Sequence, residues 1–422
     1  MMLLALPLAH ALTLEEAWSL AERDSAESTI INGQAAAAGT LRGQAISAIL
    51  PRVSISGGYT VNQYESTLDF TEALPDNLKA LVGESEPVVI NKGEFWSGSL
   101  TVVQPLFSGQ SLPGLLAAQA TARAAERSAE AAHDQLRVGV AQAYWGTLLA
   151  REKVRLTAES MERATKYAAL AGVRERLGAG RGIDTAQAEV ALARARREQV
   201  MAEAARVQAE EGLARLLGVE ANVPLERPTP HEPAAADVEA AATAALGAPG
   251  VKAAAERATA ARSARTATDL GWVPSINGRF TEAFSENTGF SGEEWNWQAA
   301  ITADWPLFDG GYRIAKQAEA AHNARVATAA EERERSLAEA DARTLYAQWQ
   351  AAREAQSFAG EEAALAEKAL KLAESSYELG ALTFLDLWAT RQQRDAAVLG
   401  LLAADMQLDV ASVSLSAKMG AR

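Results

Sequence analysis

The chain of 422 residues contains no cysteine, and its 40 basic and 54 acidic side chains give a formal net charge of −14. The acidic balance disfavours nucleic acid as a partner. Without cysteine, these residues can form no disulfide, thiolate metal site or cysteine nucleophile. No uninterrupted apolar run approaches the roughly 18 residues of a membrane-spanning helix.

The first predicted element is a targeting segment. Residues 1–11 are the most apolar stretch, and Ala9–Ala11 is typical of a signal-peptide cleavage site, although the basic start of such a peptide is missing. We expect a signal-peptide remnant there, with an ordinary apolar N-terminus as the alternative. Thr13–Glu16 then predicts a capping box, followed by a helix that runs to about Ile49 and ends before Pro51.

Four later segments alternate apolar and polar residues, which predicts strands with one apolar and one polar face. They cover residues 51–62, 95–104, 272–284 and 295–305. Each has about the 9–11 residues that cross a bilayer at a tilt. The acidic segment 63–94, which is punctuated by glycine and proline, predicts a loop between the first two strands.

Tryptophan is concentrated in these strands. Five of the nine tryptophans lie in the four segments, and aromatic residues at strand ends are typical of the interface of a membrane β-barrel. We therefore expect an aromatic girdle of Trp96, Trp272, Trp295, Trp297 and Trp305. A water-soluble sheet packed on a core is the alternative, which is disfavoured because the chain offers no other apolar layer to cover the strands.

Four long segments predict helices: 114–177, 184–217, 312–379 and 384–419. At 1.5 Å per residue, the two longest could each span roughly 100 Å. Alanine, glycine and leucine recur at steps of four and three along them, which is the spacing of a coiled-coil seam. Small seam residues bury little area per contact, so we expect long contacts, including contacts with other chains. Accidental seams in an alanine-rich chain are the alternative.

The pattern of strands and helices occurs twice. Pro105–Gly109 (Pro-Leu-Phe-Ser-Gly) returns as Pro306–Gly310 (Pro-Leu-Phe-Asp-Gly), and the pair Leu177 and Gly178 returns as Leu379 and Gly380. A repeat of this size indicates a duplicated architectural unit. We expect copy one to span 12–220 and copy two 237–422, joined by a proline-rich linker over 221–236.

Signs of enzyme chemistry are absent from the sequence. The four histidines (His10, His133, His231 and His322) have no neighbouring ligand at metal spacing. No phosphate-binding loop or nucleophile elbow is present. The glycine-rich segment 178–182 follows a long helix instead of a strand, so it predicts a helix C-cap and turn. We expect no enzyme activity, no cofactor and no metal site.

The order, spacing and duplication of these elements resemble the TolC-type outer-membrane efflux protein family over nearly the whole chain from Leu12. The resemblance implies a mostly α fold with a small transmembrane β part. It implies a homotrimer, in which three chains with four strands each close a 12-stranded β-barrel in the outer membrane. The long helices would continue into the periplasm as an α-helical barrel.

The resemblance also implies a function. The protein would be the exit duct of a tripartite efflux system and would passively conduct substrates to the outside. Its partners would be a periplasmic adaptor protein, an inner-membrane pump and outer-membrane lipid. The outer-membrane component of type I protein secretion is the alternative within this class. A soluble coiled-coil scaffold with a small sheet is the alternative from another class.

Site residues follow from the resemblance only. The pore gate would involve Asp386, Asp184 and Tyr377. The family's gate arginine falls on Leu382 and its second gate aspartate on Ala389, so Arg181 on the neighbouring hairpin would have to replace the arginine. A helix N-cap is the structural alternative for Asp386. The tips that contact the adaptor would be Gly178, Ala179, Gly180, Gly380, Ala381 and Leu382.

Overall fold

The structure is a computed structural model that describes residues 11–69, 75, 87–179, 181–233, 235–379 and 381–421. The chain divides into two compact units. Unit 1 comprises Met1–Ala37, Ala124–Ala255 and Ala329–Arg422, and unit 2 comprises Ala38–Arg123 and Glu256–Thr328. Segments of both sequence copies therefore contribute to each unit.

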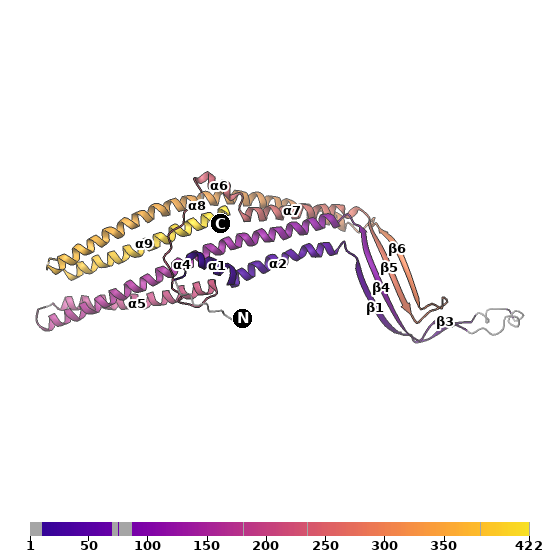
Figure 1. Ribbon diagram of the computed structural model, residues 1–422, viewed down its shortest axis with the longest axis horizontal. Coiled ribbons are helices and arrows are strands. Elements are labelled where there is room, and N and C mark those ends of the chain that lie inside the picture. Colours follow the sequence, from indigo (N-terminus) through magenta and orange to yellow (C-terminus); the bar gives the residue numbers. More distant parts are fainter. Residues whose placement is uncertain are drawn as a thin grey trace. The chain divides into compact units, whose positions relative to one another are not determined.

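Unit 2 contains a four-stranded antiparallel sheet (Figure 1). Its strands are β1 (Arg52–Val61), β4 (Glu94–Phe107), β5 (Ser275–Ser285) and β6 (Trp295–Asp304), in the order β1-β4-β5-β6. Each copy supplies one hairpin, and the two hairpins meet along β4 and β5. The edges of the sheet are β1 and β6, each of which pairs on one side only among the described residues.

The strand registers produce one apolar and one polar face, as the alternation predicts. Ile55 lies opposite Leu100, and Phe284 lies opposite Trp295, on the apolar face. On the polar face the Ser56 and Ser99 hydroxyls lie 2.9 Å apart. Members of the apolar face are exposed in the single chain: Val53, Ile55, Tyr59, Val61, Trp96, Leu100, Phe280, Trp295, Trp297 and Ile301.

Two predicted boundaries of the β part are wrong. The expected loop 63–94 contains a small hairpin of β2 (Ser66–Leu68) and β3 (Val88–Asn91), because the run Val88-Val-Ile favours a strand. The rest of that loop lies largely outside the described residues. Trp272, expected in a strand, ends the 3₁₀ helix Leu270–Trp272, and the third strand begins only at Ser275, after Pro274.

The long helices are α4 (Ser111–Arg176), α5 (Gly182–Leu217), α8 (Tyr312–Glu378) and α9 (Phe384–Met419). The 66 residues of α4 and the 67 of α8 correspond to about 100 Å each. By length and composition, α9 alone among the described helices is apolar enough to cross a membrane. Its buried Asp395, Asp405 and Asp409 instead place it in a packed helical unit.

The N-terminal helix is interrupted, which corrects the prediction of one continuous helix. Its predicted capping box is confirmed, since Glu16 N–H donates to Thr13 Oγ1 and Thr13 N–H to Glu16 Oε2. However, α1 (Leu14–Asp24) stops at Ser25, whose backbone is extended, and α2 (Ala26–Ser47) starts anew. Ser25 Oγ accepts the Ser28 N–H at 3.0 Å, so serine's preference for a cap outweighs helix continuation.

Copy two begins with helices α6 (Val238–Ala245) and α7 (Pro249–Asp269). The cores of unit 1 are built around equivalent tyrosines of the two copies. Tyr144 is fully buried in one cluster with Leu12 and Leu217, and Tyr346 lies in a second cluster with Leu415. The hydrophobic core therefore reflects the duplication seen in the sequence.

Candidate functional site

The two hairpin tips of unit 1 share one turn geometry. After α4, the Ala179 N–H donates to the Arg174 carbonyl at 2.8 Å, and after α8 the Ala381 N–H donates to the Ser376 carbonyl at 2.9 Å. Gly178 has φ of +72°, the left-handed conformation that ends such helices at low cost. The remaining predicted tip residue, Leu382, is half-buried, while Gly180 and Gly380 lie outside the described residues.

Equivalent aspartates follow the two turns, and each is held by the residue three positions before it. Arg181 donates to both oxygens of Asp184, at 2.9 and 3.1 Å. This hydrogen-bonded ion pair lowers the pKa of Asp184. At the second tip Thr383 is the N-cap of α9, and its hydroxyl lies 2.5 Å from the Asp386 carboxylate. Asp386 is thus the third residue of the helix and not its N-cap.

The predicted gate residue Tyr377 lies in an aromatic cluster. Phe384, at the start of α9, stacks on Tyr167 of α4 and lies edge-on to Tyr377, with ring centroids 6.3 Å apart. Trp388 lies 5.9 Å from the same Phe384 ring. The cluster joins the two hairpins just behind their tips.

Polar contacts continue this link between the hairpins. Arg163 of α4 donates to Asp395 of α9 at 3.1 Å, and Gln392 donates to Ser160 at 3.0 Å. Burial nevertheless raises the pKa of Asp395, because desolvation outweighs the attraction of the neighbouring arginines. Because burial removes water from the Asp395 carboxylate, the contact between the hairpins depends on the arginines that compensate its charge.

A buried polar cluster lies further along α9, and it was not predicted from the sequence. Asp409 has no exposed surface; it accepts from Trp145 Nε1 at 2.6 Å and from the His231 backbone N–H at 2.8 Å. His231 Nδ1 lies 2.7 Å from Asp409, and its Nε2 lies 3.2 Å from Glu15. These partners are 178 and 216 positions from His231 along the chain, so no local spacing could reveal them.

The linker between the copies is bound to α9 at a second point. Arg227 forms an ion pair with Asp405, which also accepts a hydrogen bond from Gln356 at 3.0 Å. The Tyr144 hydroxyl lies within 2.6 Å of the Glu226 carbonyl. The predicted linker 221–236 is therefore fixed onto the helices of unit 1 by charged and hydrogen-bonded contacts.

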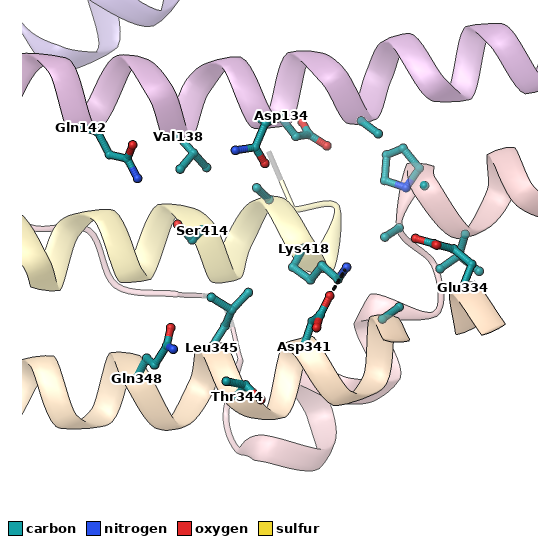
Figure 2. A pocket seen from close by; sticks show the side chains of 18 residues that line it. Asp134, Val138, Gln142, Glu334, Asp341, Thr344, Leu345, Gln348, Ser414 and Lys418 are labelled. Atoms are coloured by element: carbon teal, nitrogen blue, oxygen red, sulfur yellow. Dashed lines mark ion pairs between the residues drawn. The ribbon is translucent and has the colours of Figure 1, made fainter. Parts of the chain in front are cut away.

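Unit 1 also contains a cavity of about 560 Å³ between α4, the start of α7, α8 and α9 (Figure 2). Its charged lining residues are Asp134, Glu334, Asp341 and Lys418, and uncharged polar side chains such as Gln142 and Gln348 lie beside them. Lys418 forms an ion pair with Asp341 at 2.8 Å. Over the parts of the chain that the structure describes, no group of three His, Cys, Asp or Glu side chains could hold a metal ion.

The tryptophans of the expected girdle occupy two kinds of position in unit 2. Trp96, Trp295 and Trp297 lie on the apolar face, where Trp96 contacts Tyr59 with ring centroids 4.9 Å apart. Trp305 follows β6 and donates its indole N–H to the Trp272 carbonyl at 3.0 Å. The latter pair therefore connects the end of β6 to the segment that precedes β5.

Comparison with known proteins identifies the family that shares this architecture. The sequence model described as outer membrane efflux protein matches residues 33–219 and 241–421, one match in each expected copy. Protein CyaE of Bordetella pertussis is 31% identical over 221 residues. That match covers 50% of this chain and 47% of CyaE, so the similarity spans about half of this curated relative.

Solved structures share the fold at low sequence identity. The CmeC outer membrane channel of Campylobacter jejuni has a TM-score of 0.76 at 16% identity, covering 96% of this chain and 85% of CmeC. The MtrE outer membrane channel of Neisseria gonorrhoeae, in its open state, has a TM-score of 0.73 at 18% identity, covering 97% and 89%. With the family match over most of its length, this chain belongs to the outer membrane efflux protein family and is a protein of the outer membrane.

Proposed function

We propose that the protein is a homotrimeric exit duct that passively conducts substrates across the outer membrane. The observation that carries this proposal is the four-stranded sheet, which has one apolar face, one polar face and two edges that pair with no other strand in the described part of the chain. Unpaired backbone groups are too costly in lipid, so such a sheet must close on itself or on other copies. The polar face would then line the interior.

The number of strands favours three copies. A barrel of eight strands has an interior that is just filled by side chains, whereas larger barrels leave a channel. Two copies of this sheet would give eight strands and a filled interior, and three copies give twelve. The polar-face residues near the middle of the strands are small, for example Ser54, Ser56, Ser99 and Thr101, so they would leave such an interior open.

The helical hairpins would form the periplasmic part of the duct and carry its gate. Asp386 is exposed at the tip of α8 and α9, so three copies of it can face one another around an axis. The tips also expose Leu177 at 76% and Leu379 at 86%, so each tip offers an apolar side chain to a partner. We assign these tips to contact with a periplasmic adaptor, which connects the duct to an inner-membrane pump.

Two measurements test the proposal. The purified protein in detergent should have the mass of a trimer by light scattering, and in planar lipid bilayers it should give discrete single-channel conductance. A chain that stays monodisperse in buffer without detergent would instead be a soluble scaffold. A trimer that never conducts, even with the tip variants described below, would contradict the duct.

A further inference from the structure

The two copies differ in how the middle of their longest helix is covered, although both helices carry the same residues there. A shift of 202 residues carries Tyr144 of α4 onto Tyr346 of α8. The same shift carries Arg151 onto Arg353. Contacts of the first residue in each pair therefore predict contacts of the second.

In copy one, an extended segment of the linker covers this surface. The Arg151 guanidinium donates to the Val223 carbonyl at 2.9 Å, and the Tyr144 hydroxyl lies 2.6 Å from the Glu226 carbonyl. The segment also pairs with Leu12, whose carbonyl accepts the Glu226 N–H at 3.0 Å. As a result Tyr144 has no exposed surface, and the space left beside Arg151 and Val223 is only about 10 Å³.

In copy two, the equivalent surface is an open groove of about 670 Å³ between α8 and the last residues of the linker. Tyr346 and Trp349 line it from α8, with ring centroids 5.5 Å apart. The Arg353 guanidinium lies 5.6 Å from the Trp349 ring centroid. Glu232 and Pro233 line the groove from the linker. Among the described residues, no segment covers the groove as the linker covers copy one.

The donors of this groove lack acceptors. In the part of the chain that the structure describes, the Tyr346 hydroxyl makes no hydrogen bond, and the buried Trp349 indole N–H has no acceptor. Arg353 forms an ion pair with Glu232 at 3.9 Å, a separation too long for a hydrogen bond. A buried donor without an acceptor is costly, so the groove favours an occupant that presents acceptors along an apolar surface.

We propose that the groove binds an extended segment of a second polypeptide, in the way that the linker covers the equivalent surface of copy one. Backbone carbonyls of the bound segment accept from the Tyr346 hydroxyl and the Arg353 guanidinium, and one of its side chains packs on the Trp349 ring. Carbonyl recognition gives affinity for an extended backbone, and the pocket beside the indole gives preference for an apolar side chain.

This site is separate from the hairpin tips and does not depend on conduction. Trp349 precedes the end of α8 at Glu378 by 29 residues, which is about 44 Å along the helix. A partner in the groove therefore leaves the tips accessible to the proposed adaptor.

A segment of known fit tests the groove in the full chain. Gly218 and Gly420, the C-caps of α5 and α9, have φ of +69° and +67°, so the chain leaves both helices in the same way. The sequence of residues 221–227 (Ala-Asn-Val-Pro-Leu-Glu-Arg), appended to Arg422, continues in the register that covers copy one. The extended protein should unfold about 2 °C or more above the same protein with a scrambled extension.

Substitution of the equivalent tyrosines separates binding from folding. Tyr346→Phe keeps the ring and removes a hydroxyl without a partner in the described chain, so the unextended protein should keep its unfolding midpoint while the gain from the extension is lost. Tyr144→Phe removes a hydroxyl that already contacts the linker, so it should lower the midpoint with or without the extension. Arg353→Ala should also abolish the gain, whereas Arg333→Ala, an exposed arginine on the same helix, should retain it.

A free peptide tests whether the segment can come from another molecule. The peptide with the sequence of residues 219–227 should bind the unextended protein saturably in isothermal titration calorimetry, and a scrambled peptide should not. Arg353→Ala should weaken binding about tenfold or more. Equal affinity of wild type and Arg353→Ala, or an appended segment that gives no gain in midpoint, would overturn the groove as a peptide site. A gain from the appended segment without binding of the free peptide would overturn a second polypeptide as its source.

Discussion

His231 connects the linker to α9 through two hydrogen-bonding groups that meet the same oxygen of Asp409. Its backbone N–H donates to Asp409 Oδ1 at 2.8 Å, and its Nδ1 lies 2.7 Å from that atom. The other oxygen of Asp409 accepts from Trp145 of copy one. One carboxylate of copy two therefore holds the linker and the first copy together.

Removal of this carboxylate should destabilise unit 1 strongly. Asp409→Ala leaves the buried Trp145 indole N–H and the His231 backbone N–H without an acceptor, and loss of one partner of a buried pair typically costs about 3–5 kcal/mol. Thermal unfolding followed by circular dichroism in detergent should show a clear fall in midpoint. Glu362→Ala, an exposed carboxylate on α8, is the control and should change the midpoint little.

The same contact predicts a pH dependence of stability. The hydrogen bond to Asp409 and the charges of Asp409 and Glu15 raise the pKa of His231, although partial burial opposes them. Since the folded pKa exceeds the unfolded value of about 6.5, the stabilisation is complete below that value. It is lost as the pH rises through the folded pKa. Two neutral side chains also face this pair: Trp145 donates to Asp409, and the Trp18 ring lies beside the His231 ring.

His231→Gln should remove this pH dependence while retaining a hydrogen-bond donor toward Asp409. The difference in unfolding midpoint between wild type and variant should be largest in mildly acidic buffer and smallest above the folded pKa. The range from about pH 5 to about pH 9 includes the ordinary histidine pKa of about 6.5. A difference in midpoint that stays constant over this range would show that His231 does not titrate in the folded protein.

The proposed gate predicts unequal effects of the two tip aspartates. Asp386 is exposed and unpaired with any arginine or lysine side chain within the described part of the chain, so three copies would present negative charge to the pore. Asp386→Ala should reduce the preference for cations and weaken block by divalent cations in single-channel recording. The matched control is the double variant Arg181→Ala with Asp184→Ala, which removes a neutral ion pair and leaves the net charge of that tip unchanged. Equal conductance properties of wild type and Asp386→Ala would exclude Asp386 from the constriction.

The start of α8 depends on one arginine. Arg313 is largely buried and donates to Asp309 at 2.7 Å, to the Gly271 carbonyl at 3.3 Å and to the Pro306 carbonyl. Its guanidinium also lies 4.0 Å from the Trp272 ring centroid.

Arg313→Lys should destabilise the trimer by about 1–3 kcal/mol, because a lysine cannot form the planar set of hydrogen bonds. The measurement is the temperature of trimer dissociation. Arg325→Lys, on the same helix, is the control. If the two variants dissociate at the same temperature, Arg313 does not fix the junction.

Periodic patterns predicted the larger elements well. The alternation of apolar and polar residues predicted which side chains share a face of the sheet, because successive side chains of a strand must point to opposite sides. Local chemistry gave the capping box at Thr13 and Glu16. The prediction failed at Ser25 and Trp272, where a serine cap and a proline two residues beyond the tryptophan override the wider pattern.

The sequence by itself determined that the chain is duplicated and that its strands have one apolar and one polar face, since a repeat and a period are properties of residue order. Only the tertiary structure decided which copy-one strand pairs with which copy-two strand, and it placed β1 and β6 at the two edges of the sheet that the described strands form. It also brought Asp409 to His231 and Trp145, residues that are 178 and 264 positions away along the chain. Contacts of this range depend on how packed helices bury and desolvate polar groups, which no local pattern of residues records.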